Sequence, residues 1–201
     1  MSGVPEWIAR RRSIRSFAPD PVDEAVLETC VEAALLAPAP HHSRPWRHVV
    51  LGGSARRRLA DAMADAWLED LRRDGIGEDE ATRLCETSVQ RIASAPAAVL
   101  GCLVWDGLDD YPDVRRRDAE WAMALLSLGA SVQNLMLAAA EYRIASCWIA
   151  APVFCPDAAA ASLALDSGTR PAALVLLGHP DPAYSPPVRP PAPMGSHRLR
   201  R

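Results

Sequence analysis

The chain has 201 residues, of which 49% are hydrophobic and 23% are charged, and its formal net charge is −3. This size and apolar content predict one domain with a substantial core, or one domain with an arm, and argue against a disordered chain. The small negative charge argues against general nucleic-acid binding. All 22 basic residues are arginine, which excludes a lysine Schiff base and a lysine general base.

Cysteine usage and apolar runs indicate the compartment. The five cysteines are widely spaced and odd in number, with no C-x-x-C pair, so a reducing cytoplasm is expected. No uninterrupted apolar run reaches the ~18 residues that span a bilayer. Residues 1–6 are polar and proline-marked, unlike a targeting segment, and no membrane partner is expected.

Hydrophobic periodicity predicts short strands that alternate with longer helices. Helices are expected over residues 7–12, 26–37, 54–75, 78–92, 118–142 and 155–165, and strands over residues 48–51, 96–105, 146–149 and 172–177. Asp23 offers a cap for the second helix, and Gly75 and Gly77 break the third. These elements predict an α+β domain with a central sheet.

Two features of the chain point to a partner subunit. The predicted helix over residues 118–142 is apolar almost all round, so it should be covered on most sides, in part by a second copy. The domain is expected to span residues 1–180. The proline-rich residues 181–201 are expected to form either an extended arm across the partner or a disordered tail.

Three arginines and two serines crowd the segment from Arg11 to Phe17. The guanidinium groups repel one another, and no acidic residue inside the segment offsets them, whereas an anion would. A phosphate site is therefore the favoured interpretation, with a solvated basic helix end as the alternative. The segment lacks the glycine spacing of a P-loop or of a dinucleotide-binding fold.

A proline-stiffened loop follows the second helix, with the sequence Ala37-Pro38-Ala39-Pro40-His41-His42-Ser43-Arg44-Pro45-Trp46. Imidazole and guanidinium groups held by prolines suit a ring system or a carboxylate-rich ligand. A metal site is not expected, because adjacent histidines point apart and no Cys, Asp or Glu lies close to His41, His42 or His48 in the sequence. Cys147 lies inside an apolar strand without a visible base, so it is expected to be structural rather than nucleophilic.

These motifs resemble the nitroreductase family of flavoproteins. The family opens with a pattern like Arg-x-Ser-x-Arg/Lys-x-Phe, matched here by Arg11, Ser13, Arg15 and Phe17. It continues with a loop like Ala-Pro-Ser-x-x-Asn-x-Gln-Pro-Trp, in which Ala39 replaces the serine, His42 the asparagine and Arg44 the glutamine. Residues 118–139 and 146–149 resemble the family's long interface helix and the strand that follows it.

The resemblance implies a nitroreductase-like fold, with a central mixed sheet flanked by helices, in an interlocked homodimer with a C-terminal arm and two FMN sites. Arg11 and Ser13 would hold the FMN phosphate, and Arg15 would lie near the flavin pyrimidine edge. Pro38 and Ala39 would come from the partner subunit. The implied cofactor contacts are Arg11, Arg12, Ser13, Ile14, Arg15, Pro38, Ala39, His42, Trp148, Ile149, Ala150 and Arg189. The hydride donor is left open between NADPH, NADH and reduced coenzyme F420.

The substitutions in the proline loop are similar to a narrower group, the C-terminal nitroreductase-like domain of bifunctional coenzyme F420:L-glutamate ligases. That resemblance implies an FMN-dependent reductase that converts dehydro-F420-0 to F420-0. His41 and His42 would be the candidate catalytic residues, as donors of the second proton. The substrate would contact His41, Arg44, Trp67, Asp70 and Arg72.

Two other functions stay open. A generic NAD(P)H-dependent nitroreductase or quinone reductase would have the same fold and cofactor. A flavin- or F420-binding protein without turnover would belong to a different class. Turnover of nitroaromatics would favour the generic reductase over the dehydro-F420-0 reductase. A bound flavin that no donor reduces would favour the binding protein.

Overall fold

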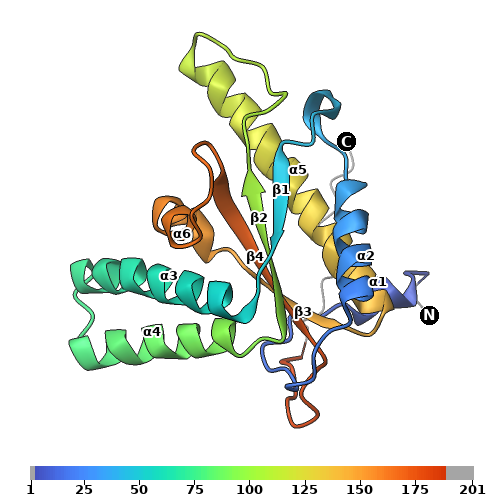
Figure 1. Ribbon diagram of the computed structural model, residues 1–201, viewed down its shortest axis with the longest axis vertical. Helices are drawn as coiled ribbons and strands as arrows, with labels where there is room; N and C mark the ends of the chain where they lie inside the picture. Colours follow the sequence, from blue (N-terminus) through green and yellow to red (C-terminus); the bar gives the residue numbers. More distant parts are fainter. Residues whose placement is uncertain (1–2, 189–201) are drawn as a thin grey trace, which may run out of the picture.

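The computed structural model describes residues 3–188 as three layers, with helices on both faces of a central sheet (Figure 1). In chain order the helices and strands are α1 (Glu6–Arg10), α2 (Glu24–Leu35), β1 (Trp46–Val50), α3 (Gly53–Arg73), α4 (Glu78–Ala93), β2 (Ala97–Leu103), α5 (Val114–Glu141), β3 (Ala145–Ile149), α6 (Pro156–Ser162) and β4 (Arg170–Gly178). Two short 3₁₀ turns are η1 (Pro40–His42) and η2 (Ala151–Val153). Each predicted helix and strand is present, and the predicted α+β class is confirmed.

The strands of the sheet are ordered β1-β2-β4-β3, and each neighbouring pair is antiparallel. Trp46 lies opposite Leu103, and Ile149 lies opposite Leu174. Within residues 3–188 a parallel contact enters through the isolated bridge between Ser13 and Ser146. The sheet that the resemblance implied to be mixed is therefore antiparallel across its strands, and the N-terminal segment supplies the parallel component.

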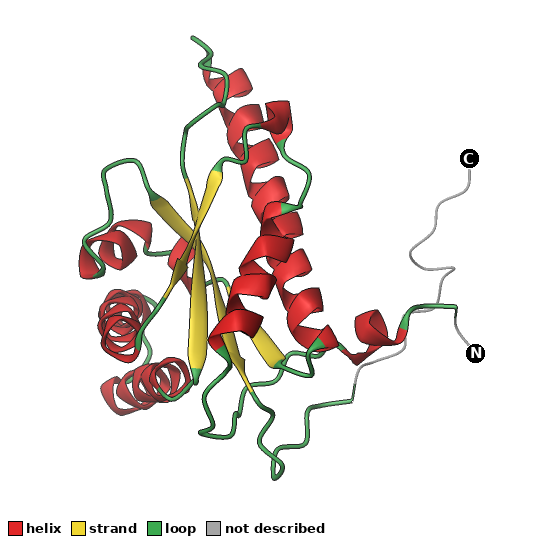
Figure 2. Cartoon of the chain, turned by 45° about the vertical axis from the view of Figure 1, so that its right-hand side comes forward, coloured by secondary structure: helices red, strands yellow, loops and turns green. Residues whose placement is uncertain are grey.

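The sheet separates two hydrophobic cores. Along β2, Ala97, Val99 and Leu103 pack in the core that α2 and α5 cover, whereas Ala98, Leu100 and Cys102 pack in the core under α3 and α6. This alternation follows from the two-residue period of a strand. Figure 2 shows α2 and α5 on one side of the sheet and α3, α4 and α6 on the other. Because both faces of β2 are covered, its sequence is an unbroken apolar run.

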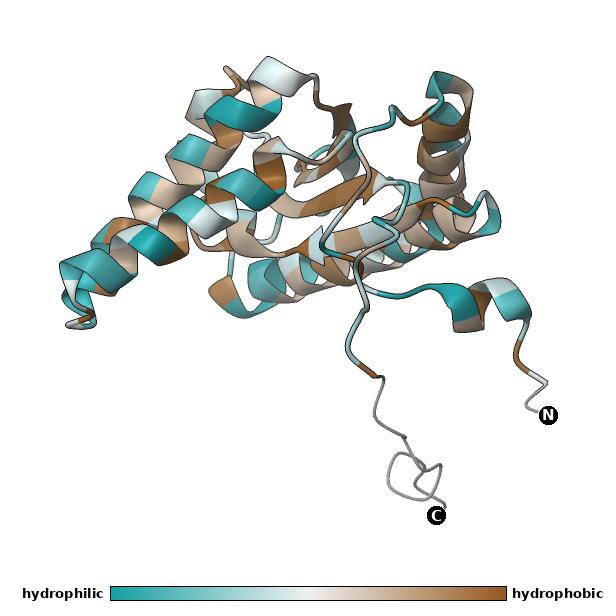
Figure 3. Cartoon of the chain, turned by 90° about the horizontal axis from the view of Figure 1, so that it is seen from below, coloured by the Kyte–Doolittle hydropathy of each residue, from teal (hydrophilic) through white to brown (hydrophobic). Residues whose placement is uncertain are grey.

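The surface of the α3–α4 hairpin is more hydrophilic than the strands of the sheet. Figure 3 shows hydrophobic strands enclosed between helices, with hydrophilic positions along α3 and α4. The two helices share a small core of their own, formed by Ala64, Leu71, Ala81 and Cys85. The hairpin is therefore a partly independent layer on one face of the sheet.

Two helix starts show how local chemistry sets the boundaries. The Asp23 carboxylate accepts a hydrogen bond from the Ala25 N–H at 2.9 Å, so the predicted cap of α2 is confirmed. The Asp113 carboxylate likewise accepts from the Arg116 N–H at 3.0 Å. This second cap starts α5 at Val114, four residues before the predicted start, inside a charged segment that was expected to be a loop.

The long helix α5 is a core helix with one apolar stripe left uncovered. It is the one helix within residues 3–188 whose length and composition would allow it to cross a membrane, although no strictly apolar run of that length was found. In this fold Ala124, Leu128 and Leu135 are buried against α2 and the sheet. On the opposite side Leu126 is 76% exposed and Met123 is 39% exposed.

Gly178 ends β4 at a point where no side chain fits. A Cβ atom on Gly178 would lie 2.8 Å from Pro96 Cδ and 2.9 Å from Phe17 Cδ1. We expect Gly178→Ala to lower the free energy of unfolding by about 1–3 kcal/mol, the usual cost of overpacking, measured by urea denaturation. Gly53→Ala is the matched control, because its Cβ would meet Arg56 Nη2 at an ordinary 3.9 Å. Equal effects of the two changes would contradict the close packing at Gly178.

The first part of the proline-rich segment turns back on the domain. Ser16 Oγ donates to an Asp181 carboxylate oxygen at 2.8 Å, and the Ala18 N–H donates to the His179 carbonyl at 2.9 Å. Arg12 donates to the carbonyl of Pro187. The boundary between residues 180 and 181 stays a prediction, and Arg189 with the rest of the tail lies outside the described residues.

Candidate flavin and loop sites

The arginine–serine segment lies beside β3. The Ile14 N–H donates to the Ser146 carbonyl at 3.0 Å, next to the Ser13–Ser146 bridge. Ile14 is buried, whereas Ser13 and Arg15 on either side of it are exposed. Ile14 thus anchors the segment, and its neighbours are left available to a ligand at the strand that ends in Trp148 and Ile149.

Four arginine residues line a cavity of about 280 Å³ at this anchor. They are Arg10, Arg11, Arg12 and Arg143, and Ser146 also lines the cavity. Arg10 Nη1 donates to the Ala140 carbonyl at 3.3 Å, which ties the cavity to the end of α5. Arg10 also pairs with Glu6 at 2.9 Å, and a cluster of arginines of this kind favours a bound anion. Arg143 was not predicted from the sequence; it follows α5 in the left-handed region with φ 59°.

The proline loop is strained and tightly seated. His41, His42 and Arg44 have φ values of 52°, 54° and 51°, a region that costs non-glycine residues free energy and is enriched at functional sites. Ser43 Oγ donates to the Pro40 carbonyl at 2.7 Å. Gly107, with φ 72°, packs so closely on Ser43 that a Cβ would lie 2.7 Å from Ser43 Cβ. The loop therefore holds its histidines in one arrangement against the segment after β2.

One chain does not bring the proline loop and the arginine cavity together. The loop contacts α5 through His41 and Glu120, and the cavity contacts α5 at Ala140. These two helix positions are 20 residues apart, which corresponds to about 30 Å along a helix. A ligand that touched both sets of predicted residues would therefore need one set from a second copy of the chain.

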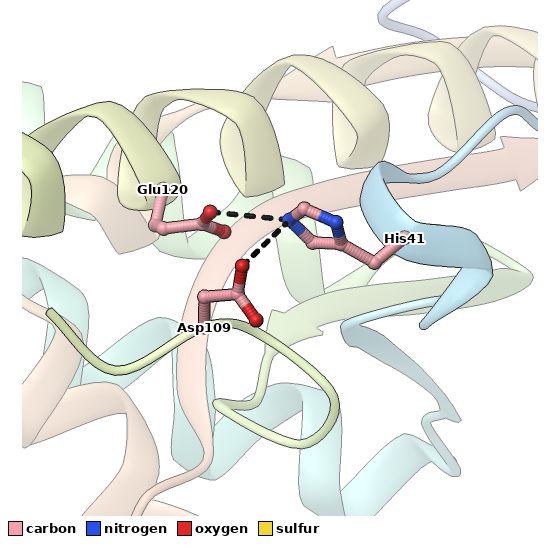
Figure 4. Close-up of side chains that lie close together, drawn as sticks. All are labelled: His41, Asp109 and Glu120. Atoms are coloured by element: carbon pink, nitrogen blue, oxygen red, sulfur yellow. Dashed lines mark hydrogen bonds and ion pairs between the residues drawn. The ribbon is translucent and has the colours of Figure 1, made fainter.

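His41 faces two carboxylates that lie far from it in the sequence (Figure 4). Its Nε2 is 3.1 Å from Glu120 Oε1 and 3.9 Å from Asp109 Oδ2. No acidic residue lies near the histidines in the sequence, but the fold supplies two, from α5 and from the loop after β2. An imidazole between two carboxylates is also a poor direct receptor for an anionic substrate, which was the expected role of His41.

The predicted substrate residues on α3 are not brought to this loop. Trp67, Asp70 and Arg72 lie on the helical layer across the sheet from α5 and η1 (Figure 1). Asp70 accepts a hydrogen bond from Arg73 at 2.6 Å, and Arg72 donates to Glu78 at 3.0 Å. Within one chain these three residues therefore cannot share a ligand with His41 and Arg44.

Four of the five cysteines are buried, and Cys155 is half-buried. Burial raises the pKa of Cys30 to about 11 and that of Cys102 to about 12. The pKa of Cys147 is also raised by burial, although Arg15 and Arg91 partly oppose the rise. All five cysteines are free. Cys147 is therefore protonated at neutral pH and fits the structural role expected of it.

Trp148 presents an aromatic surface at the end of β3. Its side chain is 43% exposed, and a Cβ on Gly129 of α5 would lie 3.9 Å from Trp148 Cη2. Trp148 is thus continuous with the exposed side of α5, near Leu126. Ile149 is half-buried and Ala150 is exposed beside it.

Comparison with known proteins gives one consistent assignment. The model of the Nitroreductase family matches residues 8–179. The putative NAD(P)H nitroreductase YfhC of Bacillus subtilis is 28% identical over 177 residues, which cover 88% of this chain and 84% of YfhC. The nitroreductase NfnB of Mycolicibacterium smegmatis is 40% identical over 63 residues, 31% of this chain, and the match spans only 27% of NfnB.

Solved structures share the fold. The FMN-dependent nitroreductase NfnB of Mycobacterium smegmatis, in complex with NADPH, superposes with a TM-score of 0.72 at 24% identity, covering 98% of this chain and 97% of that one. A BluB-like flavoprotein from Clostridium difficile gives a TM-score of 0.75 at 20% identity, with coverage of 98% and 97%. The family match extends over most of the chain and over the whole sheet. The chain belongs to the Nitroreductase family.

Proposed function

We propose that the protein is an FMN-dependent oxidoreductase that acts as a homodimer, takes electrons from NADH or NADPH, and reduces small nitro or quinone compounds in the cytoplasm. The observation that carries this proposal is the Ile14–Ser146 hydrogen bond, which fixes an arginine-lined cavity beside β3, the strand that contains Trp148. Family membership and the NAD(P)H nitroreductase YfhC, which aligns over most of both chains, support the same reaction class.

The residues around the cavity fit a flavin mononucleotide. Arg11 and Ser13 hold the phosphate, with Arg12 and Ile14 fixing the backbone beside them, because clustered guanidinium groups compensate an anion of two charges. Arg15 supplies positive charge on the exposed face of the same segment, where the reduced flavin is anionic. Trp148, Ile149 and Ala150 would hold the ring. When bound, FMN accepts and donates hydride, while the chain supplies orientation and charge.

The second subunit completes the site. The separation of about 30 Å along α5 supports the proposal that Pro38, Ala39 and His42 reach the flavin from a partner. The exposed stripe on α5 that carries Met123 and Leu126 is the surface that pairs. A two-fold dimer of this kind contains two equivalent flavin sites, and Arg189 in the tail is assigned to the phosphate of one of them.

The Arg11→Ala variant tests the flavin assignment. We expect the FMN affinity to fall by about 1.5–3 kcal/mol, the usual contribution of a hydrogen bond to a charged group, which is about 10- to 150-fold in Kd. Flavin fluorescence titration of the apoprotein measures this change. Arg83→Ala, at an exposed arginine on α4 that pairs with Glu80 at 3.6 Å, is the control and should bind FMN normally. Equal affinity in both variants would remove Arg11 from the site.

A second function is favoured by one sequence observation. His42 and Arg44 stand where the family pattern has asparagine and glutamine, and both are exposed. We propose as the alternative that these side chains bind the carboxylate or phosphate of dehydro-F420-0, with His42 as the proton donor. The wild-type protein with NADPH is offered a nitroaromatic compound and dehydro-F420-0 in parallel. Turnover of only one substrate decides between the two functions, and a flavin that no donor reduces would indicate a binding protein.

A further inference from the structure

Three side chains from distant segments converge on one point beside the proline loop (Figure 4). His41 comes from η1, Asp109 from the loop after β2, and Glu120 from the second turn of α5. One ligand atom from each lies within 4.8 Å of the other two. Residues separated by 68 and 79 positions in the chain meet here only because Gly107 packs on Ser43 and α5 passes behind the loop.

Glu120 is the unusual member of this cluster. Its side chain is only 2% exposed, on the core face of α5. One carboxylate oxygen, Oε1, meets His41 Nε2 at 3.1 Å. The other, Oε2, is buried and finds no hydrogen-bond partner among residues 3–188. A buried carboxyl group with an unsatisfied oxygen is costly, so its presence here points to a ligand that contacts it.

The imidazole alone does not satisfy both carboxylates. A single ring nitrogen offers at most one proton or one lone pair, yet Glu120 Oε1 and Asp109 Oδ2 both approach Nε2, at 3.1 and 3.9 Å. A cation placed between the three atoms would bind the nitrogen lone pair and both oxygens. One histidine with two carboxylates is a ligand set suited to first-row divalent metals.

A further hydrogen bond orients one of these ligands. The Tyr111 hydroxyl donates to Asp109 Oδ2 at 3.1 Å, and the Arg116 guanidinium lies 4.6 Å from the centre of the Tyr111 ring. Outer groups of this kind fix the direction of ligating carboxylates. Asp109 and His41 are both exposed, so an ion has a route to the cluster from solvent.

We propose that His41, Asp109 and Glu120 form a binding site for one divalent transition-metal ion, such as Mn²⁺ or Zn²⁺. Three protein ligands leave coordination positions for water or for an anionic oxygen of a substrate. The bound ion brings positive charge to the two carboxylates and to the proline loop. The site does not depend on flavin binding.

The test uses the full-length, untagged flavoprotein after removal of metals. MnCl₂ is titrated and the free ion is measured by electron paramagnetic resonance, with ZnCl₂ competition as a second readout. We expect one Mn²⁺ per chain, released by Zn²⁺. Loss of an outer-shell group alone costs metal sites about 10- to 100-fold in affinity, so Glu120→Gln and Asp109→Asn should each weaken binding at least about tenfold.

Asp110→Asn is the matched control, because it removes the same charge from the neighbouring exposed residue and should leave Mn²⁺ affinity unchanged. Circular dichroism of the metal-free variants checks the fold. If Glu120→Gln does not fold, the Asp109→Asn variant, which changes an exposed residue, still tests whether the cluster binds Mn²⁺. Absence of binding up to about 1 mM Mn²⁺, or equal weakening by Asp110→Asn, would overturn the site and leave a plain ion pair between His41 and Glu120.

Discussion

Replacing Leu126 with glutamate should break the proposed dimer into monomers and remove the flavin. Leu126 is 76% exposed at the middle of the uncovered stripe of α5, with Met123 one turn before it. Burying a leucine side chain contributes about 1.5–3 kcal/mol, and a two-fold interface contains the residue twice. The loss is therefore about 3–6 kcal/mol, and the two introduced carboxylates would also have to be desolvated.

Light scattering during size-exclusion chromatography measures the mass, and the flavin absorbance of the same peak measures occupancy. The flavin should be lost with the dimer, since the loop residues Pro38, Ala39 and His42 come from the second copy in the proposed site. Ile76→Glu is the control. Ile76 is 37% exposed at the α3–α4 turn, across the sheet from α5. This variant should therefore keep the mass of the dimer and its bound flavin. A dimeric Leu126→Glu protein would show that the subunits pair through another surface.

The layers of the fold could be predicted from local patterns. The apolar run at residues 96–105 predicted β2, because a strand buried on both faces needs no polar alternation. The start of α5 was missed, since Arg115, Arg116 and Arg117 suggested a charged loop. The Asp113 cap, with its carboxylate on the Arg116 N–H, turns that same segment into the first helical turn.

The loop site could be predicted only in part. The strained proline loop was recognised from its residues, but the contacts of His41 with Asp109 and Glu120 cross 68 and 79 positions, for which periodicity carries no signal. One clue was present in the helix pattern. Glu120 lies on the same face as Ala124 and Leu128, both of which are buried, and an acidic residue on the core face of a helix requires a partner.

His48 is a half-buried histidine that the flavin chemistry does not use. It lies on β1, where its Nε2 pairs with Ser131 Oγ at 3.0 Å. Ser131 is fully buried, and the other ring nitrogen, Nδ1, is buried without a hydrogen-bond partner within residues 3–188. Burial lowers the pKa of His48 from 6.5 to about 4. The folded protein therefore keeps this imidazole neutral where the unfolded chain binds a proton.

This difference should make the protein acid-sensitive between pH 6.5 and pH 4. The free energy of unfolding is fully retained above pH 6.5, and it falls below that value because only the unfolded state gains the proton, by at most about 3 kcal/mol at pH 4. In His48→Gln the fall between these pH values should be smaller by this amount, as measured by urea denaturation at several pH values. Ser131→Ala should keep the wild-type slope, because burial rather than the hydroxyl lowers the pKa. If His48→Gln and wild type lose stability in parallel, the buried imidazole does not control the acid response, and the carboxylates of the protein must account for it.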